Sequence, residues 1–214
     1  MNFTLAQEDS FLLGSKAAVE ELAQKEDARI LVFSDSHCSS SAVNFILHKS
    51  AKECDALVFC GDGAGDLIDA FSNPSLKDFI PPVVALVQGN NDSSLYPVKN
   101  PAVGNDSSKP FFVQLEIPQK IEFIAAGRKV AVLHGHRHSL YNGAIALKKE
   151  ASSSKAALLL YGHSHVPSCI YCGTSLLLNP GSCSKPRGKN GASYAVVKLS
   201  KKSDNIDYTF FEIS

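Results

Sequence analysis

The sequence has 214 residues, of which 44% are hydrophobic, and this is enough for one domain with a sizeable core. Its 21 basic and 21 acidic residues give a net charge of zero, so electrostatic steering toward nucleic acid or an anionic membrane is not expected. No apolar run approaches the roughly 20 residues that a membrane-spanning helix needs. We therefore expect no membrane contact and no evident nucleic-acid-binding surface.

Residues 1–28 stand apart from the pattern of the rest of the chain and are expected to form an N-terminal helical extension. Polar and acidic residues occupy its start, where a secretory signal would carry a basic segment and an apolar stretch. Apolar residues recur at helical spacing between Ser15 and Asp27, which predicts a short amphipathic helix. This helix could pack on the main domain, residues 29–214, or contact a partner, and the sequence leaves both open.

Five short apolar runs follow, and none of them alternates with polar residues. Runs of this kind are typical of strands that are buried on both faces, as in a sheet covered by other layers. They span residues 30–33, 56–60, 83–87, 130–133 and 157–161.

Three helices and a long loop are expected between the strands. Helical spacing of apolar residues predicts helices over Ser39–Lys52, Asp66–Phe71 and Leu140–Ser153. The stretch from Asp92 to Pro110 is rich in Asn, Ser, Pro and Gly, which predicts a long loop. Because this loop leaves from a candidate site residue, we interpret it as a wall or lid that selects substrate.

The second half of the chain is richer in strands than the first. Early alternation of strands and helices, followed by consecutive strands, predicts two packed sheets with helices outside. Gly127-Arg128 indicates a tight hairpin between two of these strands. The additional strands are expected over residues 111–117, 121–126, 168–171, 175–178, 194–199 and 206–213.

Each of the five apolar runs ends at a turn that holds potential metal ligands. In α/β folds, side chains just beyond the carboxyl ends of neighbouring strands converge, so ligands that are distant in the sequence meet there. One such turn would more often be an ordinary turn, but five in series indicate a site. The candidate ligands are Asp35, His37, Asp62, Asn90, His134, His163 and His165.

These candidate ligands offer only oxygen and imidazole nitrogen. This set suits manganese, iron, zinc or nickel. One ion takes about three or four protein ligands when water must keep access, so the seven candidates are too many for one ion. Two divalent ions that share one carboxylate fit the number of ligands.

The turns resemble the motifs of the calcineurin-like metallophosphoesterase superfamily. Three features are similar to its small YfcE-like phosphodiesterase branch. They are the compact size, Asn91 where larger members carry histidine, and the stretch Leu178–Ser182 followed by Pro186-Arg187-Gly188. The likeness runs from about Arg29 to the C-terminus. It implies a four-layer α/β/β/α sandwich, in which two mixed sheets are flanked by helices. The matching motifs are Asp35-x-His37, Gly61-Asp62, Gly89-Asn90-x-Asp92, His134-Gly135 and Gly162-His163-x-His165.

The resemblance also implies a division of the ligands and a reaction. Asp35, His37 and His165 would hold one ion, Asn90, His134 and His163 would hold the other, and Asp62 would bridge them. The implied enzyme is a metal-dependent phosphodiesterase that uses a metal-bridging hydroxide to attack small phosphodiesters, with manganese favoured. Two divalent ions, two carboxylates and one hydroxide leave about one positive charge, which suits a diester anion.

Roles are also predicted for residues around the ligands. An amide cannot protonate a leaving group, so Asn91 predicts a preference for good leaving groups unless His136 or His138 supplies the proton. Both histidines could equally be exposed loop residues or support a ligand. Asp92 is expected to orient a neighbour by a hydrogen bond. The predicted catalytic residues are Asn90, Asp92 and His136, and the predicted substrate-binding residues are Asn91 and Arg187.

The basic loop and the cysteines have simpler interpretations. Lys185, Arg187 and Lys189 could form a solvated loop, and Arg187 is assigned to substrate by its place in the family-like segment. The sequence has six cysteines and no visible secretory signal, so we interpret them as structural thiols of a cytoplasmic protein. Cys169-x-x-Cys172 lacks a second pair at zinc-finger spacing.

Two alternatives to a small-molecule phosphodiesterase remain. A phosphomonoesterase or protein phosphatase of the same superfamily is the first, and Asn91 argues against it. A non-catalytic scaffold similar to the retromer subunit of this fold is the second, and the full set of competent ligands argues against it. A homodimer is compatible with the sequence, although no self-complementary face can be identified.

Overall fold

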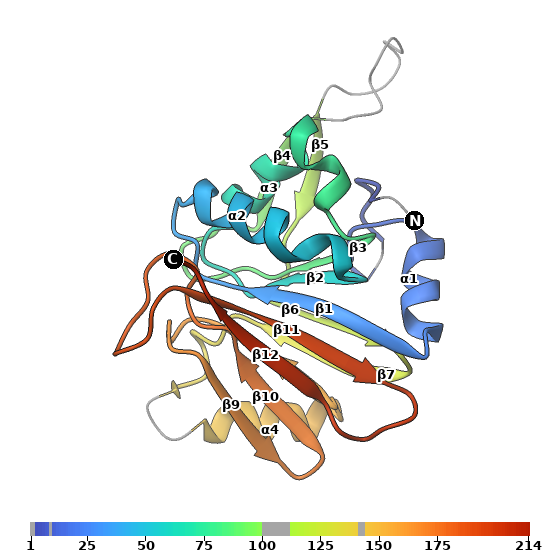
Figure 1. The fold of residues 1–214 in the computed structure, drawn as a ribbon, viewed down its shortest axis with the longest axis vertical. Coiled ribbons are helices and arrows are strands. Elements are labelled where there is room, and N and C mark those ends of the chain that lie inside the picture. The colour runs from blue at the N-terminus through green and yellow to red at the C-terminus, as the bar shows by residue number, and fades with distance from the viewer. Residues whose placement is uncertain (1–2, 9, 100–111, 141–143) are drawn as a thin grey trace.

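Two five-stranded sheets lie face to face, and helices cover their outer faces (Figure 1). The structure is a computed structural model that describes residues 3–8, 10–99, 112–140 and 144–214. The arrangement confirms the predicted α/β/β/α sandwich of two mixed sheets flanked by helices.

The first sheet has the strand order β12-β11-β1-β2-β3. Its three parallel strands are the first three apolar runs, because each is buried on both faces by the layers above and below. The strands are β1 (Asp27–Phe33), β2 (Ala56–Phe59), β3 (Val83–Leu86), β11 (Ser193–Ser200) and β12 (Asp207–Glu212).

The second sheet has the order β6-β7-β8-β10-β9, and β7, β8 and β10 are its parallel strands. The predicted hairpin joins β6 to β7, but its left-handed turn residues are Ala126 and Gly127, with φ of 47° and 67°, so Arg128 already belongs to the strand. The strands are β6 (Lys120–Ala125), β7 (Arg128–Leu133), β8 (Leu158–Leu160), β9 (Ser168–Cys172) and β10 (Ser175–Asn179).

The helices form the outer layers, and apolar side chains fill the space between every pair of layers. α2 (Ser40–Ser50) and α3 (Ala64–Phe71) cover the first sheet, together with the short helices η1 (Ala51–Glu53) and η2 (Pro74–Phe79). α4 (Ile145–Ser154) covers the second sheet. All three predicted helices are present, although residues 141–143 of the third lie outside the described residues. Within the described parts of the chain, no helix is long and apolar enough to cross a membrane.

The prediction of a loop from Asp92 to Pro110 is wrong for the first part of this stretch, because β4 (Leu95–Lys99) forms a strand that pairs antiparallel with β5 (Phe112–Glu116). Pro97 is tolerated in this separate two-stranded sheet because, among the described residues, no further strand pairs with β4 and would need the missing N–H. Residues 100–111, which include most of the hypothetical lid, lie outside the described residues.

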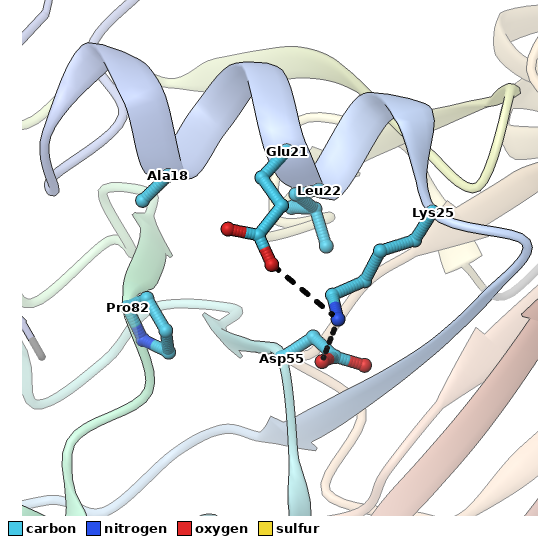
Figure 2. Close-up of a pocket in the computed structure, with 6 residues that line it drawn as sticks. All are labelled: Ala18, Glu21, Leu22, Lys25, Asp55 and Pro82. Atoms are coloured by element: carbon cyan, nitrogen blue, oxygen red, sulfur yellow. Dashed lines mark ion pairs between the residues drawn. The ribbon is translucent and has the colours of Figure 1, made fainter. Parts of the chain in front are cut away.

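The N-terminal segment packs on the domain and continues its core. Leu12 and Leu22 are buried between the two sheets, and Leu13 exchanges two backbone hydrogen bonds of 2.8 Å with Val84 at the edge of the first sheet. The helix α1 (Lys16–Gln24) lies across the side of the sandwich and is held at its end by Lys25, which pairs with Glu21 and Asp55 (Figure 2).

Burial of an apolar side chain contributes more to stability than ion pairs that are half exposed. Leu22→Ala should therefore lower the free energy of unfolding by about 2–4 kcal/mol. Lys25→Met, which removes both ion pairs shown in Figure 2, should change it by less than about 1 kcal/mol. Urea unfolding of the two variants and the wild type measures both values. Equal and small effects would show that the extension does not stabilise the domain.

Candidate metal centre

The candidate site lies where the parallel strands of both sheets end. Loops follow β1, β2 and β3 in the first sheet and β7, β8 and β10 in the second, and hydrogen bonds between these loops join them at one end of the sandwich. Five of these loops carry the predicted ligands, and the sixth, after β10, carries the segment that ends at Ser182. The fold therefore brings together turns that are far apart in the sequence, as the positions of the apolar runs predicted.

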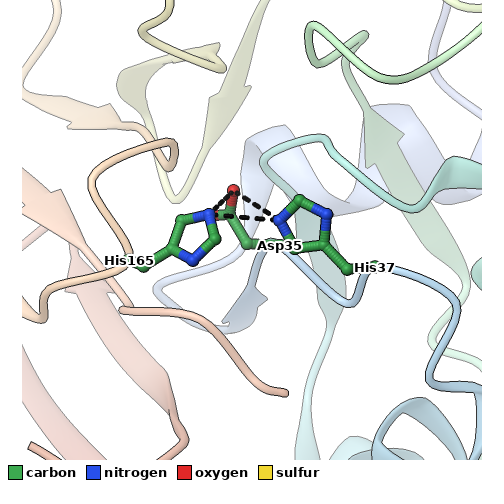
Figure 3. A group of neighbouring side chains, drawn as sticks. All are labelled: Asp35, His37 and His165. Carbon is green, nitrogen blue, oxygen red and sulfur yellow. Dashed lines mark hydrogen bonds and ion pairs between the residues drawn. The ribbon is translucent and has the colours of Figure 1, made fainter. Parts of the chain in front are cut away.

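Asp35, His37 and His165 form the first cluster (Figure 3). The Nε2 atoms of the two imidazoles lie 3.1 Å apart. Asp35 Oδ1 lies 3.3 Å from Nε2 of His165 and 3.9 Å from Nε2 of His37. Three ligand atoms thus surround one small volume, as a metal ion requires.

The second cluster shares Asp35 with the first and adds Asp62 and His134. His134 Nε2 lies 3.5 Å from Asp62 Oδ2 and 3.9 Å from Asp35 Oδ1. Asp62 Oδ2 is also 3.9 Å from His37 Nε2, so both carboxylates face both clusters. Five of the seven predicted ligands are therefore in contact, and either carboxylate is placed where it could serve two ions.

The donor atoms of this site fit divalent cations. Asp35 Oδ1 and His134 Nε2 are buried and have no hydrogen-bond partner. The tautomers of two histidines are set by backbone carbonyls, because His134 Nδ1 donates to Cys60 O at 2.6 Å and His165 Nδ1 donates to Lys185 O at 2.6 Å. Their Nε2 lone pairs then face carboxylate oxygens, an arrangement that a cation stabilises and that is otherwise repulsive.

The carboxylate of Asp62 is ionised in this setting. Burial would raise its pKa, but in the absence of a cation a protonated His134 imidazole, together with two N–H donors of Asn91, outweighs burial and holds the pKa well below its usual range. Asn91 donates from its backbone to Asp62 Oδ1 at 2.8 Å and from its amide to Oδ2 at 2.7 Å. One predicted substrate-binding residue is therefore already engaged with a ligand.

Five of the predicted ligands adopt left-handed backbone conformations, which are uncommon outside glycine. Each such residue costs about 1 kcal/mol or more, so it persists only where the surroundings hold it in place. Asp and His tolerate this region better than most residue types, which suits the turns they occupy. The φ angles are 56° at Asp35, 44° at His37, 59° at Asp62, 66° at His163 and 60° at His165.

Asp92 is the residue that fixes the turn after β2. Its carboxylate accepts four backbone N–H groups, from Asp62, Gly63, Ala64 and Gly89, at 2.7–2.9 Å. The expectation that Asp92 orients neighbours by hydrogen bonding is thus matched by its contacts. Because both of its oxygens are engaged with backbone, it acts through Asp62 as a positioning residue.

The segment that ends β10 and follows it fixes the other turns, a role that could not be predicted from its sequence. Ser182 Oγ donates to Asp35 O at 2.7 Å, and Ser184 Oγ donates to Ser36 O at 2.6 Å. Asn179 Nδ2 donates to Gly162 O at 2.7 Å, beside His163. The only signal in the sequence was the family-like stretch Leu178–Ser182, which does not show which groups it contacts.

The remaining predicted residues lie around the two clusters without joining them. His163 donates its backbone N–H to Asp35 Oδ2 at 3.1 Å, and its ring lies 5.1 Å from that of His134 between centroids. The ring of His136 lies 5.5 Å from that of His134. Asn90 is exposed in the turn before Asn91. Arg187 is also exposed, and its backbone N–H donates to His165 O. Their predicted roles as ligand, catalytic residue and substrate contact stay predictions.

Comparisons with known proteins agree with this geometry. Residues 29–202 match the family model of the calcineurin-like phosphoesterase superfamily domain. The chain is 24% identical over 179 residues to the probable metallophosphoesterase YsnB of Bacillus subtilis, a match that covers 84% of this chain and 89% of YsnB.

Solved structures show the same fold. A conserved protein of Streptococcus pneumoniae, described as a predicted phosphoesterase, has a TM-score of 0.63 and 27% identity over 88% of this chain and 91% of its own. YfcE, a phosphoesterase of E. coli, has a TM-score of 0.53 and 21% identity, and the match covers 87% of this chain and 100% of YfcE. Vacuolar protein sorting 29 of Cryptosporidium parvum has a TM-score of 0.60 and 16% identity, covering 89% and 100%.

Gly162→Ala should displace the carboxylate of Asp35. A Cβ at this position would lie 2.1 Å from Ser34 Oγ and 2.8 Å from Asp35 Oδ2, so Asp35 would have to move. We expect manganese affinity, measured by calorimetry, to fall about 10- to 100-fold. Gly65→Ala is the matched control, because its Cβ would meet nothing closer than 3.8 Å. Unchanged affinity in Gly162→Ala would contradict the placement of Asp35.

Asp92→Asn should destabilise the protein and loosen the site together. Replacing a carboxylate that accepts four N–H groups should cost about 2–4 kcal/mol of unfolding free energy in urea. Manganese affinity should fall as well, because the Asp62 turn loses its anchor. Asp69→Asn, on the exposed side of α3, removes the same charge and should change neither quantity. A stable Asp92→Asn protein would show that the turn is held in another way.

Proposed function

The chain belongs to the calcineurin-like phosphoesterase superfamily, and on this premise we propose that it is a metal-dependent phosphodiesterase that acts on small phosphodiesters. The proposal includes two divalent ions, with manganese favoured over iron, zinc or nickel.

One observation carries the proposal: two buried carboxylates and three imidazoles converge with their ligand atoms facing one another. Asp35 Oδ1 and His134 Nε2 are left without any partner in the protein, although both are buried. An unpaired buried polar atom costs about 1–3 kcal/mol, so a fold that keeps two of them at one point favours a bound cation there. A purely structural role for this surface would not require them.

The chain's own residues prepare the site for a charged substrate. In the proposal, Asp35, His37 and His165 hold one ion, His134, His163 and Asn90 hold the other, and Asp62 faces both. Bound divalent ions would supply a water of lowered pKa and positive charge for the phosphoryl oxygens. The carbonyls of Cys60 and Lys185 keep the imidazoles of His134 and His165 in the tautomer that such ions need.

Arg187 supports binding of the phosphoryl group. Its backbone N–H bonds to His165 O at 3.1 Å, so the loop that carries it is attached to a ligand. A guanidinium beside the clusters suits a phosphate ester, whose oxygens accept paired hydrogen bonds.

Asn91 sets the leaving-group preference of the proposed phosphodiesterase. Its amide donates to Asp62 Oδ2 and cannot give up a proton near neutral pH, so leaving groups that depart without a proton are favoured. His136 is the proposed alternative acid, because its ring lies next to those of His134 and His163.

The test compares an aryl phosphodiester with its matching monoester, after chelation and addition of manganese. We expect metal-dependent diester hydrolysis that falls at least about 1,000-fold in Asp62→Asn and in His134→Ala, since each removes a ligand of the proposed centre. Exposed Asp69→Asn is the control and should keep full activity.

Dominant turnover of the monoester would instead assign the protein as a phosphomonoesterase. Hydrolysis of neither ester with manganese, iron, zinc or nickel would contradict an enzymatic role. It would favour a scaffold function, which the fold that the chain shares with vacuolar protein sorting 29 also permits.

A further inference from the structure

The imidazole of His37 lacks the support that two other candidate ligands have. The Nδ1 atoms of His134 and His165 donate to backbone carbonyls, whereas Nδ1 of His37 makes no hydrogen bond to any described residue. His37 and the next residue, Cys38, both have left-handed backbone conformations, with φ of 44° and 67°. Residues in this conformation persist only where their surroundings hold them, so the place of the His37 ring depends on how its turn is held.

A buried carboxylate that the proposed reaction does not use lies beside this turn. Asp66, in the first turn of α3, is 8% exposed and forms no ion pair with any described residue. Its Oδ2 accepts a hydrogen bond of 2.5 Å from Oγ of Ser36, the residue between Asp35 and His37. Its Oδ1 accepts a longer bond of 3.3 Å from Ser40, at the start of α2. Burial of a carboxylate is costly unless hydrogen bonds compensate it, so the short bond from Ser36 is a principal contact of Asp66.

The space around the Ser36 hydroxyl is closed on every side that the structure describes. Gly63 has φ of 130°, and a Cβ there would lie 2.0 Å from Ser36 Oγ and 3.0 Å from Asp66 Oδ2. The same Cβ would lie 3.0 Å from the backbone N of His37. The backbone of Ser36 is held as well, because its carbonyl accepts Ser184 Oγ at 2.6 Å. Glycine at position 63 therefore lets the hydroxyl, the carboxylate and the turn of His37 meet.

We propose that Asp66 is a positioning residue for the ligand His37 and acts through the hydroxyl of Ser36. The bond to Ser36 holds the turn, and the turn holds the imidazole among the ligand atoms of the first cluster (Figure 3). Asp66 itself contacts neither the ligand atoms nor the substrate. This role requires the metal centre of the proposed function and does not depend on which ester is hydrolysed.

The contact acts on His37 rather than on Asp35, because Asp35 has partners of its own. The carbonyl of Asp35 accepts the Ser182 hydroxyl at 2.7 Å, and its Oδ2 accepts the N–H of His163 at 3.1 Å. Among the described residues, the backbone of His37 makes one hydrogen bond, from its N–H to Asp62 O at 3.2 Å. Loosening the residue between the two ligands should therefore displace His37 first.

The test measures manganese binding to chelated protein by calorimetry. Ser36→Ala and Asp66→Ala should each weaken binding about tenfold, and the double variant should lose no more than either, because all three delete the same bond. Ser40→Ala removes the other bond to this carboxylate, away from the ligands, and should weaken binding less than about twofold. Asp69→Ala is the matched control, since it removes an exposed carboxylate from the same helix.

Two further backgrounds distinguish positioning from a loss of charge or of stability. In His37→Ala, adding Asp66→Ala should cost less than about twofold in manganese affinity, because the residue that it positions is absent. In His134→Ala, the same change should keep its effect of about tenfold. A purely structural role would lower the free energy of unfolding in urea but leave the manganese affinity of the folded protein unchanged.

Equal losses in the two backgrounds would show that Asp66 acts through its charge, and this result would overturn the proposal. Unchanged affinity in Ser36→Ala would overturn it as well, while the metal centre and the phosphodiesterase function would stand. Absence of manganese binding by the wild type is a different result, which would contradict the metal centre and the positioning role with it.

Discussion

The candidate metal centre depends on buried hydrogen bonds that cross from one loop to the next. Ligands such as Asp35 and Asp62 sit in left-handed turns that an isolated peptide would leave, so each turn needs an external partner. Asp92 supplies that partner for the turn after β2, and Ser182 supplies it for the turn after β1. Without these bonds the ligand atoms would not be held within a few ångströms of one another, and the site would lose its pre-organisation.

The layered fold provides a rigid base for these loops. Parallel strands in both sheets end on the same side, and the apolar layer between the sheets fixes their relative positions. The strands can be wholly apolar because every face is covered, which leaves all of the site's polar chemistry to the loops. The N-terminal segment adds to the same layer through Leu12 and Leu22, so it is part of the base that supports the site.

Much of the fold and of the ligand set could be predicted from the sequence, because burial and ligation leave local patterns. Unbroken apolar runs marked the parallel strands, and Asp or His directly after them marked the turns that the fold brings together. β4 was not predicted, because Pro97 and its polar surroundings are typical of a loop and only pairing with β5 makes the segment a strand. The contacts of Asn91 with Asp62 and of Ser182 with Asp35 were not predictable either, since they join residues 29 and 147 positions apart and depend on side-chain placement. Asn90 and His163 illustrate the remaining limit, because their positions in a motif do not determine how their side chains point.

The number of ions in the centre is measured most directly by the stoichiometry of manganese binding to chelated protein, followed by electron paramagnetic resonance. Two ligand clusters, with the carboxylate of Asp62 facing both, predict two ions per chain and a spectrum of exchange-coupled manganese, because ions a few ångströms apart interact magnetically. Binding of a single ion with an isolated-manganese spectrum, or no binding, would contradict a dinuclear centre.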